Sequence, residues 1–153
     1  MQKISTMLWF DGQAEEAAKL YTSIFKNSKM GRTFRPGGEG TPALTVEFDL
    51  EGRPFQALNG GPQFKFTEAM SLVVNCDDQK EVDHFWNSLT ADGGKESQCA
   101  WLKDRFGVSW QIVPKRLVEL LNDKDPGRSS RAMQAMLAMQ KIDIAKLEAA
   151  ANG

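Results

Sequence analysis

The sequence predicts an α+β fold of two βαβββ modules followed by a helical tail. The first observation is a seven-residue phrase that occurs twice, as GRPFQAL and as GVSWQIV, each with Gln in its fifth position. The second is that an apolar strand and an amphipathic helix precede both copies in the same order. The third is that only helical patterns follow Pro114. We expect a single domain, with modules at residues 1–62 and 66–114 and a helical extension at 115–153.

Each module begins with a short strand and a helix. In the first module, the strand STMLWFD at residues 5–11 leads into an Asp-Gly turn, and a helix follows within residues 13–26. In the second module, SLVVNCD at 71–77 and a helix within 78–94 repeat the pattern, and Gly93-Gly94 is expected to end that helix. The predicted apolar faces share one spacing: Ala17, Leu20, Tyr21 and Ile24, then Val82, Phe85, Trp86 and Leu89.

A hairpin is expected after each helix. Residues 43–50 alternate apolar and polar side chains, as a half-buried strand does, and residues 54–59 form the returning strand. The second hairpin is expected at 99–103 and 108–113. Its charged tip, Lys103-Asp104-Arg105, is expected to be solvated.

The first module carries a longer connection, GRTFRPGGEGT, at residues 31–41. We expect this segment to be a loop, because Pro36 and the glycines around it disfavour regular structure.

Three helices are expected in the tail. KRLVELL at 115–121 is the first, stopped by Asp125-Pro126-Gly127, and DIAKLEAAA, capped by Asp143, is the third. Between them, residues 129–140 form the second helix, with Ser129 or Ser130 as its N-cap. One face of this second helix carries a stripe of Met and other residues that is expected to pack on the sheet or on a partner subunit. The alternative is that the stripe forms a flexible lining of a ligand cavity. The stripe consists of Met133, Met136, Leu137 and Gln140.

Composition limits the classes of partner. The net charge of −1 and the pI near 5.9 give no broad basic surface for nucleic acid. No apolar run approaches the ~20 residues that span a membrane, and the N-terminus lacks a secretory signal pattern. Cys76 and Cys99 are too few for a disulfide framework, so we expect a cytoplasmic protein in which both are buried small hydrophobes.

Several segments together resemble a known family. WFDGQAEEAAKLYTSIF, WLKDRFGVSWQIVP and MLAMQKIDIAKLEAA are similar to PhnB-like proteins, also labelled demethylubiquinone-methyltransferase-like, of the glyoxalase/bleomycin-resistance (vicinal oxygen chelate) superfamily. The resemblance covers nearly the whole chain. It implies that the two βαβββ modules form curled mixed sheets around a cleft for a small molecule, usually in a homodimer. Because one fold carries many functions, the activity must be argued from the site.

The resemblance also implies site positions. In metal-dependent members of the superfamily, the first and last strands of each module supply the metal ligands, and these positions are Ser5, Gln56, Ser71 and Gln111 here. The internal repeat pairs them in the same way, Ser5 with Ser71 and Gln56 with Gln111. Strand alternation adds further side chains on the same faces, and we expect these to contact the ligand. They are Met7, Trp9 and Asn75.

The residue types at these positions favour binding without a metal ion or other cofactor. First-row divalent ions prefer imidazole, carboxylate or thiolate, whereas Ser hydroxyls and Gln amides are neutral and weak ligands. The one histidine, His84, lies opposite the apolar face of its helix, where an exposed role is expected. Four hydroxyl and amide groups can orient a polar ligand, or they can satisfy one another in a degenerate site. Glu47 and Asp49 could act as acid or base, but strand alternation alone also explains them.

Three functions follow as hypotheses. The first is a metal-free protein that binds an unidentified small organic molecule in the cleft. The second is an enzyme of the same superfamily, lyase-like or dioxygenase-like, for which no catalytic residue is identified. The third is a methyltransferase acting on a quinone-like substrate. The chain lacks the GxGxxG turn and parallel βαβ pattern of a common adenosyl site, which disfavours the third.

Overall fold

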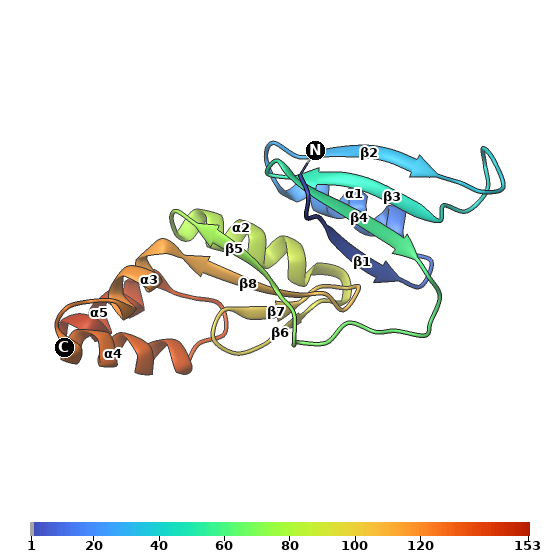
Figure 1. The fold of residues 1–153 in the computed structure, drawn as a ribbon. Helices are drawn as coiled ribbons and strands as arrows, with labels where there is room; N and C mark the ends of the chain where they lie inside the picture. The colour runs from blue at the N-terminus through green and yellow to red at the C-terminus, as the bar shows by residue number, and fades with distance from the viewer. Residues whose placement is uncertain (1) are drawn as a thin grey trace. The chain divides into compact units, whose positions relative to one another are not determined.

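The computed structural model describes residues 2–153 and confirms the α+β fold with two βαβββ modules (Figure 1). Two compact units meet in sequence between Phe66 and Thr67. The first unit holds one module and the second unit holds the other module with the helical tail. Among the described residues, no helix is long and apolar enough to cross a membrane. A single domain and a cleft shared by the two modules stay predictions.

The first module is a four-stranded mixed sheet with one helix on one face (Figure 1). The strands lie in the order β1-β4-β3-β2, with β1 and β4 parallel and the other pairs antiparallel. The predicted helix face is buried except for the half-buried Leu20. Its elements are β1 (Thr6–Phe10), α1 (Ala14–Ile24), β2 (Lys29–Phe34), β3 (Thr45–Leu50) and β4 (Arg53–Asn59).

The second module repeats this topology, with strand order β5-β8-β7-β6 and a parallel β5/β8 pair. All four predicted apolar residues of α2 are buried, and Asp78 caps the helix by accepting from the backbone N–H of Glu81. The α2 helix ends in a short 3₁₀ turn in which Gly93 has a φ of +110°. The elements are β5 (Leu72–Cys76), α2 (Gln79–Thr90), η1 (Ala91–Gly93), β6 (Lys95–Glu96), β7 (Trp101–Lys103) and β8 (Ser109–Pro114).

The tail adds α3 (Lys115–Leu121), α4 (Pro126–Leu137) and α5 (Ile144–Asn152). Asp143 caps α5 by accepting from the backbone N–H of Lys146, as predicted. The three helices share a buried apolar cluster that also contains Ala100 of the second module. Its other buried members are Leu117, Leu120, Ala132, Ile142, Leu147 and Ala151.

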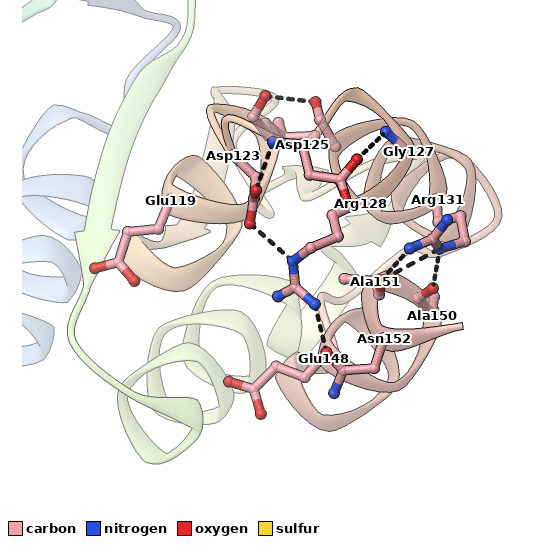
Figure 2. A network of polar contacts seen from close by, with 12 residues as sticks. Glu119, Asp123, Asp125, Gly127, Arg128, Arg131, Glu148, Ala150, Ala151 and Asn152 are labelled. Atoms are coloured by element: carbon pink, nitrogen blue, oxygen red, sulfur yellow. Dashed lines mark hydrogen bonds and ion pairs between the residues drawn. The ribbon is translucent and has the colours of Figure 1, made fainter.

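Arginine side chains hold the tail helices together (Figure 2). Arg131 Nη2 donates to the carbonyl of Ala151 at 2.7 Å, so it satisfies a free carbonyl at the end of α5. Arg128 donates to Asp123 at 2.9 Å and to Asn152 at 2.6 Å. These contacts join the start of α4 to the end of α5.

The loop prediction for residues 31–41 was wrong in its first part. Residues 31–34 belong to β2, which pairs with β3 across an irregular register between Met30 and Thr33. Gly31 allows a close approach of the two strands there, because a Cβ would lie 3.0 Å from the backbone oxygen of Glu47. The loop signals, Pro36 and the glycines around it, lie after this strand, and the prediction extended the loop too far toward Gly31.

The start of α4 was also predicted wrongly. Asp125 is its N-cap, accepting from the N–H of Gly127, and Pro126 occupies the first helical position. Proline fits the first turn of a helix because it has no N–H to leave unpaired there. The Asp-Pro pair therefore starts α4, and Ser129 lies inside it.

Three further predictions of burial need correction. Asp104 at the hairpin tip is only 3% exposed, rather than solvated. Cys99 lies in a turn, half-buried, and β7 begins only at Trp101. Met133 and Leu137 are 49% and 47% exposed, so these two do not pack on the sheet, and their packing on a partner subunit stays a prediction. α4 buries Ala132 in the cluster instead.

Candidate functional site

The two repeated glutamines occupy equivalent places in their sheets. Gln56 of β4 lies in register between Met7 of β1 and Glu47 of β3. Gln111 of β8 lies in register between Val73 of β5 and Trp101 of β7. Because side chains alternate along a strand, each Gln projects from the sheet face opposite the buried residues that contact the module's helix. We call this face of each sheet its open face.

A pocket of about 390 Å³ lies on the first module. Ser5 and Gln56, the two residues predicted for this module, both line it. The pocket volume is within the range of small-molecule sites. The other lining residues are Gln2, Gly31, Arg32, Glu47, Phe48, Asp49, Gly52, Pro54 and Phe55.

A bidentate ion pair forms part of the wall of this pocket. Arg32 Nε donates to Glu47 Oε2 at 3.1 Å, and its Nη2 donates to Oε1 at 3.0 Å. The hydrogen bond from Arg32 lowers the pKa of the Glu47 carboxyl from its ordinary value, and the same bond raises the pKa of Arg32. Glu47 is therefore held as a carboxylate, which does not favour a role as a proton donor near neutral pH.

In the second module the two predicted polar residues contact each other. Gln111 Nε2 donates to Ser71 Oγ at 2.9 Å. This bond orients the Gln amide and leaves its carbonyl oxygen as an acceptor. Val73 and Asn75 lie exposed on β5 beside this pair. The mutual satisfaction that the sequence left open thus occurs in this module.

Met7 and Trp9 are on the same face of β1, but only one is held in place. Met7 is 51% exposed. The Trp9 indole N–H donates to the carbonyl of Gly61 at 2.8 Å, and its ring meets Phe64 edge-on at 4.9 Å. The segment after β4 therefore fixes the orientation of Trp9 in the first module.

The donor sets do not fit a first-row divalent ion. Within residues 2–153, no three His, Cys, Asp or Glu side chains come together as a metal site requires. Glu47 lines the first pocket, but both of its oxygens already accept from Arg32. Ser71 and Gln111 are neutral and bonded to each other. No chemical step through a metal is derived from these residues.

Two other candidate groups carry no chemistry in this structure. His84 is exposed, as predicted, and its ring meets Phe85 edge-on at 4.9 Å. Burial, followed by the negative charge of Glu81 and its neighbours, raises the pKa of the Cys76 thiol to about 12. A thiol with such a pKa is not a nucleophile near neutral pH.

Arg32 is the site residue that sequence reasoning missed. It lies in the segment that was interpreted as a loop, and its partner Glu47 is in another strand. Lys29 and Arg32 pair with Asp49 and Glu47 of β3, and such cross-strand charge pairs stabilise antiparallel neighbours. The register is irregular between Met30 and Thr33, so regular strand alternation in the sequence does not reveal this pairing.

A protein-family model described as 3-demethylubiquinone-9 3-methyltransferase matches residues 2–113. The chain belongs to this family. Residues 114–153, which hold the tail helices, lie outside the match. No curated protein matches the chain.

One solved structure agrees with the family assignment, and a second shows the same fold. A PhnB protein from Bacillus cereus, titled a putative 3-demethylubiquinone-9 3-methyltransferase, is 33% identical with a TM-score of 0.65 and covers 74% of this chain and 99% of its own. A Pseudomonas aeruginosa protein is 20% identical with a TM-score of 0.62, covering 74% and 98%.

A more distant structure shows the fold alone. A fosfomycin resistance protein from Listeria monocytogenes, solved with Mn(II) and dihydroxypropylphosphonic acid, is 11% identical with a TM-score of 0.54, covering 74% of this chain and 92% of its own. A glyoxalase/bleomycin resistance protein from Albidiferax ferrireducens is 13% identical with a TM-score of 0.50, covering 72% of this chain and 95% of its own, so the modules have the glyoxalase/bleomycin-resistance fold, as the sequence predicted.

Proposed function

We propose that this protein binds a small organic molecule through the open faces of its modules, without a metal ion. The observation that carries the proposal is the pocket of about 390 Å³ that Ser5 and Gln56 line together. Both residues belong to the positions that the internal repeat marks. A hydroxyl, a primary amide and the Arg32–Glu47 pair offer donors and acceptors to a polar ligand, and the exposed Met7 offers apolar surface on the same face.

The absence of a suitable metal donor set favours sequestration or an accessory role over metal-assisted catalysis. Of the two carboxylates that line the pocket, Glu47 pairs with Arg32 and Asp49 pairs with Lys29, and the predicted positions Ser5 and Gln56 are uncharged. Such a site selects a ligand by hydrogen-bond pattern and shape. We infer that the ligand carries both donors and acceptors.

Methyl transfer to a quinone-like ring is the second candidate, because the family description names that activity. Its cofactor needs an adenosyl site, commonly a glycine-rich turn in a doubly wound parallel sheet. Both sheets of residues 2–153 are instead four-stranded and mixed. We therefore rank methyl transfer below ligand binding.

A thermal-shift screen tests the proposal. A ligand at a hundred times its dissociation constant adds about 2.7 kcal/mol of stability, which is about 5 °C or more for a chain of this size. A metabolite that stabilises the wild type should lose its effect on Gln56→Ala and keep it on Gln134→Ala, an exposed site on α4. Equal shifts on both variants would place the ligand elsewhere.

Two further arms of the screen separate the alternatives. S-adenosylmethionine should give no shift if the protein is not a methyltransferase. Mn²⁺ and Zn²⁺ should give none if the site is metal-free. A shift with either one, lost in Gln56→Ala, would replace the proposal with the corresponding enzyme.

We also propose that the protein forms a homodimer. Apolar side chains remain exposed on the first module, among them Ile4 and Phe34, and such surfaces mark protein contacts. Sedimentation equilibrium should give the mass of two 17.0 kDa chains. A monomer mass at micromolar concentration would contradict the proposal.

A further inference from the structure

The helical tail contacts the edge of the second sheet at a specific place. In the first module the edge strand β2 has six residues, whereas its counterpart β6 has two. β6 pairs with Leu102 and Lys103 of β7, so it is the residues before Trp101 that lack an edge strand as neighbour. The connection between α4 and α5 contacts this part of the chain, because the N–H groups of Cys99 and Ala100 donate to the carbonyls of Met139 and Gln140 at 2.9 and 3.0 Å.

The two residues that donate these bonds are strained. Cys99 has a φ of 54° and Ala100 a φ of 77°, so both lie in the left-handed region. That region costs a residue with a Cβ about 1–2 kcal/mol. The carbonyl of Ala100 also accepts from the N–H of Ile112 at 2.9 Å, which ties the turn to β8. Strain of this kind persists where surrounding contacts hold it.

The connection is itself anchored to α2. Gln79 Nε2 donates to the carbonyl of Ile142, and Gln79 Oε1 accepts from the N–H of Ile144, both at 2.9 Å. Lys141 and Asp83 form an ion pair at 3.0 Å. Ile142 is fully buried in the cluster that contains Ala100. Gln79 therefore acts as a clamp on both sides of the point where α5 begins.

The strained turn leads directly to the open face. Trp101 follows Ala100 and lies in register with Gln111, whose amide donates to Ser71. We propose that the tail is a positioning element for this face: it holds the Cys99–Ala100 turn and thereby sets Trp101 beside Gln111. The link to ligand binding rests on the proposed function. The proposal that the tail holds the Cys99–Ala100 turn does not rest on the proposed function.

The tail lies outside the part of this chain that the family model and the Bacillus cereus structure match. The Bacillus cereus protein is covered over 99% of its length by 74% of this chain, and the family match ends at residue 113. An element outside the shared modules thus controls a shared site position. Trp101 and Gln111 become residues through which the tail influences ligand choice.

Hydrogen exchange on the full-length Gln79→Ala variant tests the bracing. Losing both clamp bonds should speed exchange of the Cys99, Ala100 and Ile112 amides about tenfold or more, while amides of β3 and β4 keep their rates. Gln134→Ala, an exposed Gln in the same tail, should change none of these rates. Unchanged exchange at the three amides in a folded Gln79→Ala protein would overturn the proposal.

Nuclear magnetic resonance adds a readout of position. The NMR signals of the Gln111 side-chain amide and of the Trp101 indole N–H should change their chemical shifts in Gln79→Ala. Neither chemical shift should change in Gln134→Ala. If Gln79→Ala does not fold, Lys141→Ala supplies a milder version through the ion pair with Asp83. Neither measurement uses a ligand. If the ligand screen fails but amide exchange changes in Gln79→Ala, the proposed function is wrong while the proposal that the tail holds the Cys99–Ala100 turn stands. Faster exchange of the Cys99, Ala100 and Ile112 amides with an unchanged chemical shift of the Gln111 side-chain amide would show that the tail does not position the site.

Discussion

The side-chain amide of Gln111 donates a hydrogen bond of 2.9 Å to the hydroxyl oxygen of Ser71. These residues are 40 positions apart, and the bond joins the start of β5 to β8 on the open face of the second sheet. It is a direct contact between two residues that the internal repeat had marked.

This bond should show as coupling between the two residues. Ser71→Ala removes the acceptor and should lower the free energy of unfolding by about 0.5–1.5 kcal/mol, since the amide is half-buried. Gln111→Ala should make the same serine substitution nearly neutral. Urea denaturation of the two single variants and the double variant gives the coupling. Strictly additive effects would show that the bond adds no stability.

The Arg32–Glu47 pair predicts a pH dependence in the first module. The pKa of Glu47 is lowered in the folded state, chiefly by the hydrogen bond from Arg32. A carboxyl with a depressed folded pKa adds stability above its unfolded pKa, and this stability is lost as the pH falls through the folded value. Carbon-detected titration should find Glu47 below its ordinary range in the wild type. It should return to that range in Arg32→Ala, and an unchanged titration would contradict the pairing.

The duplicated topology could be predicted because it rests on local patterns. The apolar spacing of Val82, Phe85, Trp86 and Leu89 is a property of one helix, and all four are buried. The positions of Gln56 and Gln111 were implied by the family resemblance, and the internal repeat supported them. These features require no knowledge of distant contacts.

The rest depended on contacts that sequence periodicity does not record. Gly31 lies in a strand at a close approach to Glu47, and Asp104 is buried because the N–H groups of Phe106, Val108 and Trp110 converge on it. The strained Cys99–Ala100 turn depends on carbonyls 40 residues later in the chain. At such places tertiary contacts override local propensity.

Gly60 and Trp9 predict a steric effect beside the first open face. A Cβ on Gly60 would lie 2.4 Å from the Trp9 ring, closer than real contacts allow. Gly60→Ala should therefore cost about 1–3 kcal/mol, as overpacking does. Phenylalanine lacks the outer indole atoms that make this contact. In a Trp9→Phe background, Gly60→Ala should therefore cost much less. Equal costs in both backgrounds, measured by denaturation, would contradict the contact.

Cys76 should resist thiol reagents while the protein is folded. Burial, with nearby negative charge, raises the pKa of this thiol to about 12, so little thiolate exists near neutral pH. Iodoacetamide at pH 7.5 should leave Cys76 unmodified over hours and label it after unfolding in urea, as read by peptide mass spectrometry. Rapid labelling of the folded protein at Cys76 would show that β5 opens readily.

The hydrogen bonds to the buried Asp104 carboxylate predict a large loss of stability in Asp104→Asn. The Asp104 carboxylate accepts from the backbone N–H groups of Phe106 and Val108 and, at 2.9 Å, from the Trp110 indole. In Asp104→Asn one oxygen becomes an NH₂ group that faces another donor. Hydrogen bonds to a charged acceptor are worth about 1.5–3 kcal/mol, so the free energy of unfolding should fall by about that amount.

A nearby aspartate provides the matched control for Asp104. Asp92 pairs with Arg105 at 3.2 Å, and its side chain is largely exposed, so Asp92→Asn should change stability by no more than about 0.5 kcal/mol. Trp110→Phe removes the indole donor, and in that background Asp104→Asn should cost less because the amide can turn its NH₂ toward the vacated position. Chemical denaturation measures the free energy of unfolding of Asp104→Asn, Asp92→Asn, Trp110→Phe and the double variant of Asp104 and Trp110. If Asp104→Asn is as mild as Asp92→Asn, the buried carboxylate does not hold the hairpin that returns the chain to Gln111.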